Sequence, residues 1–303
     1  MRQKTALVLS GGGARGIAHI GVIEELEKRG YEITSIAGTS MGSLVGGIYA
    51  LGMMGQFKEW ICKLDKRSVF GLVDFALSKQ GLIKGDKVFR TMKTFIPDTK
   101  IEQLPIPFTA VAVDLIQKEE VLFRKGSLYD AIRASVAIPS VFTPVKTGKR
   151  LLVDGGVMNN IPVNHVQRTE GDLVVAVNVN AEIPVSKPAV TKEEGARRGK
   201  VYQERISEFR HYLAIESRRH TDNSESRGSH EEKMGYFSLL TRTIDLMTMH
   251  MADLSLKFHE PDILINVSRD SCHVYDFYKA EEMLESGREA AVSALDAYRK
   301  FMS

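Results

Sequence analysis

The sequence predicts an α/β protein in which helices cover a mainly parallel sheet. Within the first 55 residues, short apolar runs alternate with stretches of helical periodicity, in the order strand, loop, helix, strand, turn, helix. Consecutive strands joined through a helix pair in parallel, because the helix returns the chain to the end of the sheet from which it started. Later apolar runs extend this pattern along the chain.

The first strand is expected at residues 6–9, followed by a glycine loop at residues 11–16. A helix is expected over residues 17–29, because Gly30 stands where a helix C-cap is favoured. Its apolar side chains gather on one side, and they are Ile17, Ile20, Val22, Ile23 and Leu26. This face is expected to pack on the sheet.

A second strand at residues 33–37 leads through a tight turn into an uncharged helix. Residues 36–57 carry no charge, and Gly38, Gly42 and Gly46 have the spacing of a membrane-helix dimer motif, so a membrane span is an alternative. The stretch holds few large apolar side chains among its glycines and hydroxyls. A helix buried on all sides within a globular core is therefore favoured.

Further elements are expected along the rest of the chain. The strands are predicted at residues 108–114, 151–153, 173–179 and 263–267, with an edge strand at 120–123. A helix at residues 128–136 is expected to stop before Pro139. The chain is expected to end in helix at residues 275–302, broken near Gly287.

Residues 184–258 differ from the rest in composition. Residues 184–235 are rich in Lys, Arg, Glu and Ser, whereas residues 236–258 are rich in Met and Leu with helical periodicity. We therefore expect one domain over residues 1–303, with a polar and then amphipathic helical insertion at about 184–258. Its amphipathic part could offer a homodimer face.

The bulk composition narrows the functional class. The chain has 303 residues, a formal net charge of +3 and no basic stripe, which argues against nucleic-acid binding. Its two cysteines lack metal-ligand spacing, so neither a disulfide framework nor a metal site is expected. The apolar run at residues 6–9 is too short for a signal peptide, which predicts a cytoplasmic protein.

The motif Gly38-Thr39-Ser40-Met41-Gly42 has the pattern of a nucleophile elbow. A serine on a sharp turn between strand and helix takes a strained backbone conformation, and flanking glycines let neighbouring chain pass close by. The following helix N-terminus favours negative charge beside the serine. The alternative is that Ser40 is only a helix N-cap among packing glycines.

A second motif is the glycine-rich loop Gly11-Gly12-Gly13-Ala14-Arg15-Gly16. Consecutive glycines can direct backbone N–H groups at one oxygen and form an oxyanion hole. The same loop fits a dinucleotide-binding fingerprint, which also needs an acidic residue at the end of the second strand. Glu32 precedes that strand instead. A dinucleotide-binding oxidoreductase is thus the weaker alternative.

The third motif, Asp154-Gly155-Gly156, follows the apolar run at residues 151–153. An aspartate at a strand end is well placed to meet a nucleophile from a neighbouring strand, although a turn aspartate before glycine is the alternative. A free carboxylate, with a pKa of about 3.9, is a weak base. Partial burial and a hydrogen bond to Ser40 are expected to improve it.

A Ser-His-Asp triad is a further alternative. Several histidines follow Asp154 in the order that α/β-hydrolases use, and they are His165, His211, His220, His230, His250, His259 and His273. In that fold, however, the nucleophile follows several strands, whereas Ser40 follows only the second. No histidine occupies a convincing strand-end loop, and His19 is expected to make a packing or polar contact.

Together the three motifs resemble the patatin-like phospholipases, of the compact bacterial type that is similar to the catalytic domain of neuropathy target esterase. The loop matches the family pattern GGGxRG, Ser40 the nucleophile of GxSxG, and Asp154 the aspartate of DG[GA]. Residues 135–139 and 160–163 also look like family segments. The resemblance covers residues 5–179 and returns from residue 261, but residues 184–258 depart from it.

The resemblance implies a three-layer α/β/α sandwich that hydrolyses fatty acyl esters of phospholipids, lysophospholipids or neutral lipids, without metal or cofactor. It implies that Asp154 accepts the proton of Ser40 and that the glycine loop, with the N–H of Met41, stabilises the oxyanion. Arg15 is expected to tie down loop carbonyls in preference to binding a phosphate. The partner is then a lipid, met peripherally at a membrane surface.

An apolar slot for the acyl chain remains to be located. Candidate lining residues, which would equally suit ordinary core packing, are Leu44, Met53, Met54, Phe70 and Phe75. A non-catalytic lipid-binding or regulatory protein is the remaining alternative. The intact Ser40, Asp154 and glycine loop argue against it, since a binder does not need a nucleophile elbow.

Overall fold

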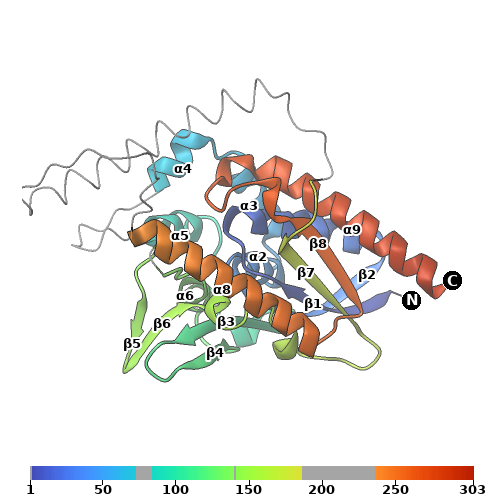
Figure 1. The fold of residues 1–303 in the computed structure, drawn as a ribbon, viewed down its shortest axis with the longest axis horizontal. Helices are drawn as coiled ribbons and strands as arrows, with labels where there is room; N and C mark the ends of the chain where they lie inside the picture. Colours follow the sequence, from blue (N-terminus) through green and yellow to red (C-terminus); the bar gives the residue numbers. More distant parts are fainter. Residues whose placement is uncertain (1, 73–83, 140, 186–235) are drawn as a thin grey trace, which may run out of the picture.

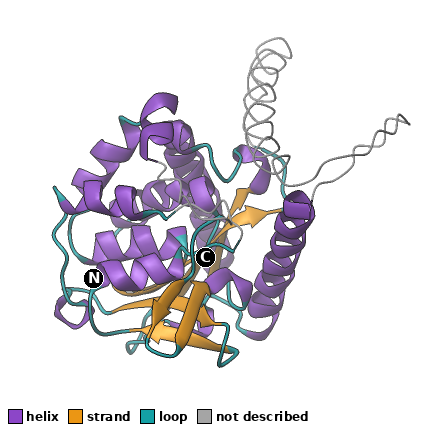
Figure 2. Cartoon of the chain, turned by 90° about the vertical axis from the view of Figure 1, so that its left-hand side faces the viewer, coloured by secondary structure: helices purple, strands orange, loops and turns teal. Residues whose placement is uncertain are grey.

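A computed structural model describes residues 2–72, 84–139, 141–185 and 236–303 (Figure 1). Within these residues an eight-stranded sheet runs through the middle of the molecule, with helices on both faces (Figure 2). The strands are β1 (Gln3–Leu9), β2 (Tyr31–Thr39), β3 (Phe108–Asp114), β4 (Glu119–Phe123), β5 (Val145–Thr147), β6 (Arg150–Asp154), β7 (Leu173–Ala181) and β8 (Ile263–Ser268). The predicted α/β/α sandwich is confirmed.

The central strands are parallel and the strands at one end are antiparallel. The parallel pairs are β3 with β2, β2 with β1, β1 with β7 and β7 with β8. The antiparallel pairs are β3 with β4, β3 with β6, and β5 with β6. All seven residues of β3 are buried, as expected for a strand covered on both faces.

Strand β3 has three partners on its two edges. Its residues 110–114 pair with β4, residues 108–111 pair with β2, and residues 112–114 pair with β6. Because both other ladders overlap the β4 ladder, β2 and β6 must share the opposite edge. The two strands approach along that edge from opposite directions, so their carboxyl ends face each other.

Alternate residues of β1 enter two separate cores. Leu7 and Leu9 join the larger core with the helices α1 and α9, whereas Ala6 and Val8 join a smaller core with α8. The helices are α1 (Ala18–Lys28), α2 (Met41–Ala50), α3 (Met54–Cys62), α4 (Lys66–Leu72), α5 (Asp86–Lys93), α6 (Leu128–Ser135), α8 (Tyr236–Phe258) and α9 (Ala280–Met302). Short 3-10 turns include η1 (Gly13–Ile17) and η3 (Gly155–Val157).

The C-terminal helix differs from the prediction. Helix α9 begins at Ala280, after a 3-10 turn at Phe277–Lys279, and runs unbroken through Gly287. A Cβ at Gly287 would lie 1.9 Å from the carbonyl oxygen of Ala18, and a Cβ at Gly21 would lie 1.9 Å from that of Leu284. The glycine therefore allows close packing of α9 on α1 and does not interrupt the helix.

The uncharged stretch at residues 36–57 is not a membrane span. It divides into the end of β2, the ten-residue α2 and the start of α3, and α2 is buried along most of its length. Among the described residues, no helix combines the length and apolar character needed to cross a bilayer. Most of the predicted insertion lies outside the described residues, and its amphipathic part forms α8, which crosses one face of the sheet (Figure 1).

Candidate active site

Ser40 occupies a strained turn between β2 and α2. Its φ of 53° and ψ of −124° lie in a region that residues other than glycine rarely adopt. The flanking glycines are needed for close packing, because a Cβ at Gly42 would lie 2.2 Å from the carbonyl oxygen of Leu9, and one at Gly38 would lie 2.5 Å from that of Gly42. This is the backbone geometry of a nucleophile elbow.

Hydrogen bonds from other elements fix this turn. The backbone N–H of Ser40 donates to Ser135 Oγ at 2.9 Å, and Ser135 Oγ in turn donates to the carbonyl oxygen of Val111 at 2.6 Å. The Thr39 hydroxyl donates to the carbonyl oxygen of Asn159 at 2.8 Å. Sequence reasoning assigned no role to Ser135. Its position at the end of a predicted helix gave no sign that it would meet the serine turn.

Asp154 reaches Ser40 from the opposite direction along β3. In the ladders, Thr39 pairs with Val111 and Asp154 pairs with Ala112, so the ends of β2 and β6 face neighbouring residues of β3. Gly155 permits this meeting, because a Cβ there would lie 2.3 Å from the carbonyl oxygen of Val111. Ser40 and Asp154, 114 positions apart in the sequence, are thereby brought together.

The Asp154 carboxyl is buried, with 5% of the residue surface exposed. Burial raises its pKa to about 6, although the nearby Ser40 hydroxyl and the N–H of Gly156 both lower it. Oδ1 accepts the Gly156 N–H at 2.8 Å. Within the described residues no group donates a hydrogen bond of normal geometry to Oδ2, and this includes the Ser40 hydroxyl. The carboxyl is thus close to a serine hydroxyl and poorly stabilised as an anion.

The glycine loop leaves some of its N–H groups free and uses others. Gly11 N–H donates to the carbonyl oxygen of Asn160 at 3.2 Å, and Ala14 N–H donates to that of Val274 at 2.9 Å. In the described part of the chain, the N–H groups of Gly12, Gly13 and Met41 have no such partner. Gly11 and Ala14 therefore use their N–H groups to shape the loop, and those of Gly12, Gly13 and Met41 remain candidates for binding an oxyanion.

The remaining loop residues have packing roles. Arg15 donates to the carbonyl oxygens of Gly12 at 3.4 Å and Arg269 at 3.1 Å, which agrees with the expected tying of loop carbonyls. Gly16 lies against the Met41 side chain, since a Cβ there would come within 2.5 Å of Met41 Cγ. This contact holds the loop beside the start of α2.

Of the histidines considered for a triad, His211, His220 and His230 lie outside the described residues, and His19 and His165 have partners other than Ser40 and Asp154. His19 is fully buried, and its Nε2 is 2.8 Å from the carbonyl oxygen of Ser10. Burial lowers the His19 pKa to about 4, so the ring is neutral and ties α1 to the start of the glycine loop. His165 pairs with Glu120 on β4. Over the described ranges, neither Ser40 nor Asp154 has a hydrogen bond to a histidine, which argues against a triad.

The residues expected to line an acyl slot are dispersed. Leu44 is in the larger core, with Met53 and Met54 packed against its edge beyond the C-terminal end of α2. That end lies about 14 Å from Ser40 along the helix. Phe70 is 67% exposed on α4, and Phe75 lies outside the described residues. The acyl-binding assignment therefore stays a prediction.

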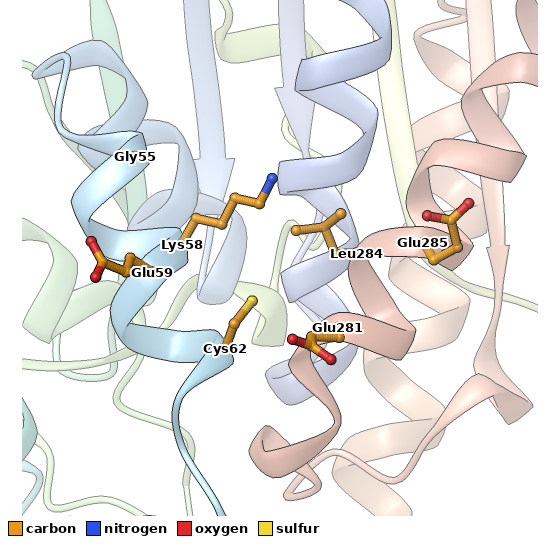
Figure 3. Close-up of a pocket in the computed structure, with 7 residues that line it drawn as sticks. All are labelled: Gly55, Lys58, Glu59, Cys62, Glu281, Leu284 and Glu285. Atoms are coloured by element: carbon orange, nitrogen blue, oxygen red, sulfur yellow. The ribbon is translucent and has the colours of Figure 1, made fainter.

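Two surface hollows in the described part of the chain are lined by residues other than Ser40 and Asp154. One, of about 410 Å³, lies between α3 and α9 (Figure 3). Its lining residues are Gly55, Lys58, Glu59, Cys62, Glu281, Leu284 and Glu285. The other lies beyond the C-terminal end of α2, where Met54 and Tyr49 are among its lining residues. Neither offers an apolar slot beside the serine.

Comparison with known proteins identifies the family of this chain. The family model described as patatin-like phospholipase matches residues 7–166, which is more than half of the chain and includes all three motifs. The chain belongs to the patatin-like phospholipase family. The strained serine turn, the buried aspartate and the glycine loop described above all lie within the patatin-like segment.

One relative in this family aligns with nearly the whole chain, and others align with more than half of it. An NTE family protein of Mycobacterium tuberculosis is 36% identical over 331 aligned positions, covering 97% of this chain and 92% of the relative. The lysophospholipase NTE1 of Candida glabrata is 29% identical, covering 59% of this chain and 11% of its own. Patatin-like phospholipase domain-containing protein 6 of Mus musculus is 31% identical, covering 58% and 14%. The solved structure of VipD from Legionella pneumophila aligns with a TM-score of 0.47 at 17% identity, covering 98% of this chain and 67% of VipD.

Proposed function

We propose that this protein is a serine lipid acyl hydrolase in which Ser40 is the nucleophile and Asp154 the base. Family membership supports lipid ester hydrolysis in general terms. The observation that carries the specific assignment is the meeting of a strained serine with a buried carboxyl whose pKa is raised to about 6. A pKa near neutrality suits a general base, because the group is ionised at pH 7 and yet basic enough to accept a proton.

The first step forms an acyl-enzyme. Ser40 Oγ attacks the carbonyl carbon of the ester while its proton passes to Asp154. The carbonyl oxygen becomes an oxyanion that the free N–H groups of Gly12, Gly13 and Met41 can stabilise. When the tetrahedral intermediate collapses, the bond to the alcohol breaks and the alcohol leaves with the proton from Asp154. The acyl group is then an ester of Ser40.

The second step returns the enzyme to its starting state. Water attacks the acyl carbon and transfers a proton to Asp154, and Ser40 leaves as the regenerated alcohol with that proton. Fatty acid is the product. The substrate class we propose is phospholipid, lysophospholipid or neutral lipid, taken from a membrane surface on which the protein docks peripherally. One relative of this family is named a lysophospholipase, which favours a lysophospholipid among these.

A fluorophosphonate probe and a p-nitrophenyl ester test the nucleophile. Wild type is expected to become labelled and to release p-nitrophenol, whereas Ser40→Ala should do neither. Ser286→Ala is the matched control. Ser286 is a partly exposed serine on α9, and its hydroxyl donates to the carbonyl oxygen of Glu282 in the same helix. Product analysis on mixed phospholipids then identifies the substrate. Wild type that takes no label and releases no product would favour a non-catalytic lipid-binding protein.

A further inference from the structure

Asn160 lies at the centre of the site, although the mechanism above gives it no role. It follows β6 and η3 in the chain and is 2% exposed. Its carbonyl oxygen accepts the N–H of Gly11, so its backbone is joined to the glycine loop. Its side chain consequently lies among the parts of the site that carry out the reaction.

The Asn160 carboxamide lies close to the nucleophile and to the base. The position of a Cβ on Gly11 would be 2.5 Å from Asn160 Oδ1 and 3.0 Å from Ser40 Cβ. The position of a Cβ on Gly156 would be 3.1 Å from Asn160 Oδ1 and 3.1 Å from Asp154 Oδ1. The Asn160 carboxamide therefore lies near both residues. Gly11 separates it from Ser40, and Gly156 separates it from Asp154.

Each of these two neighbouring side chains, Asn160 and Asp154, has one buried polar atom without a partner in the described part of the chain, and the two atoms are of opposite character. Within the described residues, Asn160 Nδ2 has no hydrogen-bond acceptor and Asp154 Oδ2 has no donor. A buried donor or acceptor without a partner costs about 1–3 kcal/mol, so such groups usually face a bound molecule. A molecule that accepts one hydrogen bond and donates another would satisfy both, and water does so.

We propose that Asn160 Nδ2 and Asp154 Oδ2 together hold the water that hydrolyses the acyl-enzyme. The inference rests on the proposed function and assigns its second step. Asn160 donates an N–H to the water oxygen, and the water donates one O–H to Asp154. The water oxygen then bonds to the acyl carbon, its proton passes to Asp154, and the bond from that carbon to Ser40 Oγ breaks as Ser40 takes the proton.

A role in holding water fits better than a role in stabilising the oxyanion. The three free N–H groups of Gly12, Gly13 and Met41 already provide donors for an oxyanion. The Asn160 carboxamide instead shares the neighbourhood of Gly156 with the carboxyl that must accept a proton from water. Its removal should therefore slow the release of the acyl group and leave the formation of the acyl-enzyme largely intact.

The test separates the two steps in Asn160→Ala and in the more conservative Asn160→Ser. With excess p-nitrophenyl butyrate, both variants should show a rapid burst of p-nitrophenol, followed by steady turnover that is lowered about 100-fold in Asn160→Ala. Intact-protein mass spectrometry should detect a butyryl group accumulating on the variant. Fluorophosphonate labelling, which needs no water attack, should stay within about threefold of wild type. Asn160→Ser retains a donor and should recover part of the turnover.

Asn159→Ala is the matched control. Asn159 is a buried neighbour whose side chain donates to Glu120 and Asn164, away from Ser40. It should show neither a burst nor acyl-enzyme accumulation. The inference is overturned if Asn160→Ala slows labelling and turnover equally, or if it changes neither. A failure of the proposed function looks different, because wild type itself would then resist the probe.

Discussion

The parallel and antiparallel parts of the sheet supply one half of the candidate site each. Ser40 follows β2, whose neighbours β1 and β3 are both parallel to it, whereas Asp154 ends β6, which is antiparallel to both of its partners. The two parts meet on one edge of β3. The candidate pair is thus formed where two strand ends converge and not within either region.

The two parts are also stabilised differently. The parallel part packs a large apolar core, and closely apposed glycines bring α1 and α9 together. The antiparallel part has a smaller core that includes Ala112, Val121 and Leu152, and it depends more on polar contacts. Asp114, for example, accepts the N–H groups of Ile116 and Leu151 there. Apolar packing therefore dominates in the parallel part, and polar contacts contribute more in the antiparallel part.

The largest expected effect comes from the antiparallel side. Asp154→Asn should lower kcat by about 10²–10⁴-fold, because the amide cannot accept the serine proton. The folded pKa of Asp154 is raised from 3.8 to about 6, so the native state loses stability as pH rises between these values. Chemical unfolding at pH 8 should therefore find the variant more stable than wild type. Equal stability at pH 8 and full activity would contradict the assigned role of the carboxyl.

The pH profile tests whether this carboxyl is the base. Because burial raises the pKa of Asp154 to about 6, kcat/KM should fall about tenfold for each pH unit below 6 and level off above it. Initial rates on a soluble ester between pH 4.5 and 8 measure this. A profile that stayed flat down to pH 4.5 would mean that a carboxyl with an ordinary pKa, or none, acts in the reaction.

On the parallel side the expected effect is on stability. Gly287→Ala should lower the free energy of unfolding by about 3 kcal/mol, because its Cβ would meet the backbone of Ala18. Gly55→Ala is the control, since Gly55 is helical and a Cβ added there would have nothing within 4 Å. It should gain up to about 1 kcal/mol from helix propensity. If both variants changed the free energy of unfolding alike, the close packing of α9 on α1 would not be what stabilises the parallel part.

The smallest expected effect is at the connection between the two parts. Ser135 links Ser40 N–H to the Val111 carbonyl, so Ser135→Ala leaves both backbone groups unpaired. We expect a loss of about 2 kcal/mol in the free energy of unfolding, together with a lower kcat. Ser286→Ala, which removes only a partly exposed hydroxyl, is again the control. An unchanged kcat in a destabilised Ser135→Ala would show that this bond supports the fold without orienting the nucleophile.

Local patterns in the sequence were enough to predict the first βαβα segment and the serine turn. An apolar run followed by glycines at fixed offsets leaves few backbone conformations, so the positions of β1, β2 and Ser40 follow from short-range sterics. The strands β3, β4, β6, β7 and β8 were located by apolar runs, whereas the three-residue β5 was not predicted. Gly287 misled the prediction because a glycine within a helix reads as a break unless the neighbour that packs on it is known.

Tertiary structure decided which distant residues meet. The sequence contains Asp154 and a glycine after it, but the antiparallel direction of β6 and its place on the edge of β3 bring that carboxyl to Ser40. The contacts of Ser135 and Asn160, the engaged N–H groups of Gly11 and Ala14, and the raised pKa of Asp154 depend on long-range packing and burial in the same way. Short-range steric effects act within a few residues and can be predicted from the sequence. Burial and strand pairing depend on the whole chain and become visible only in the folded molecule.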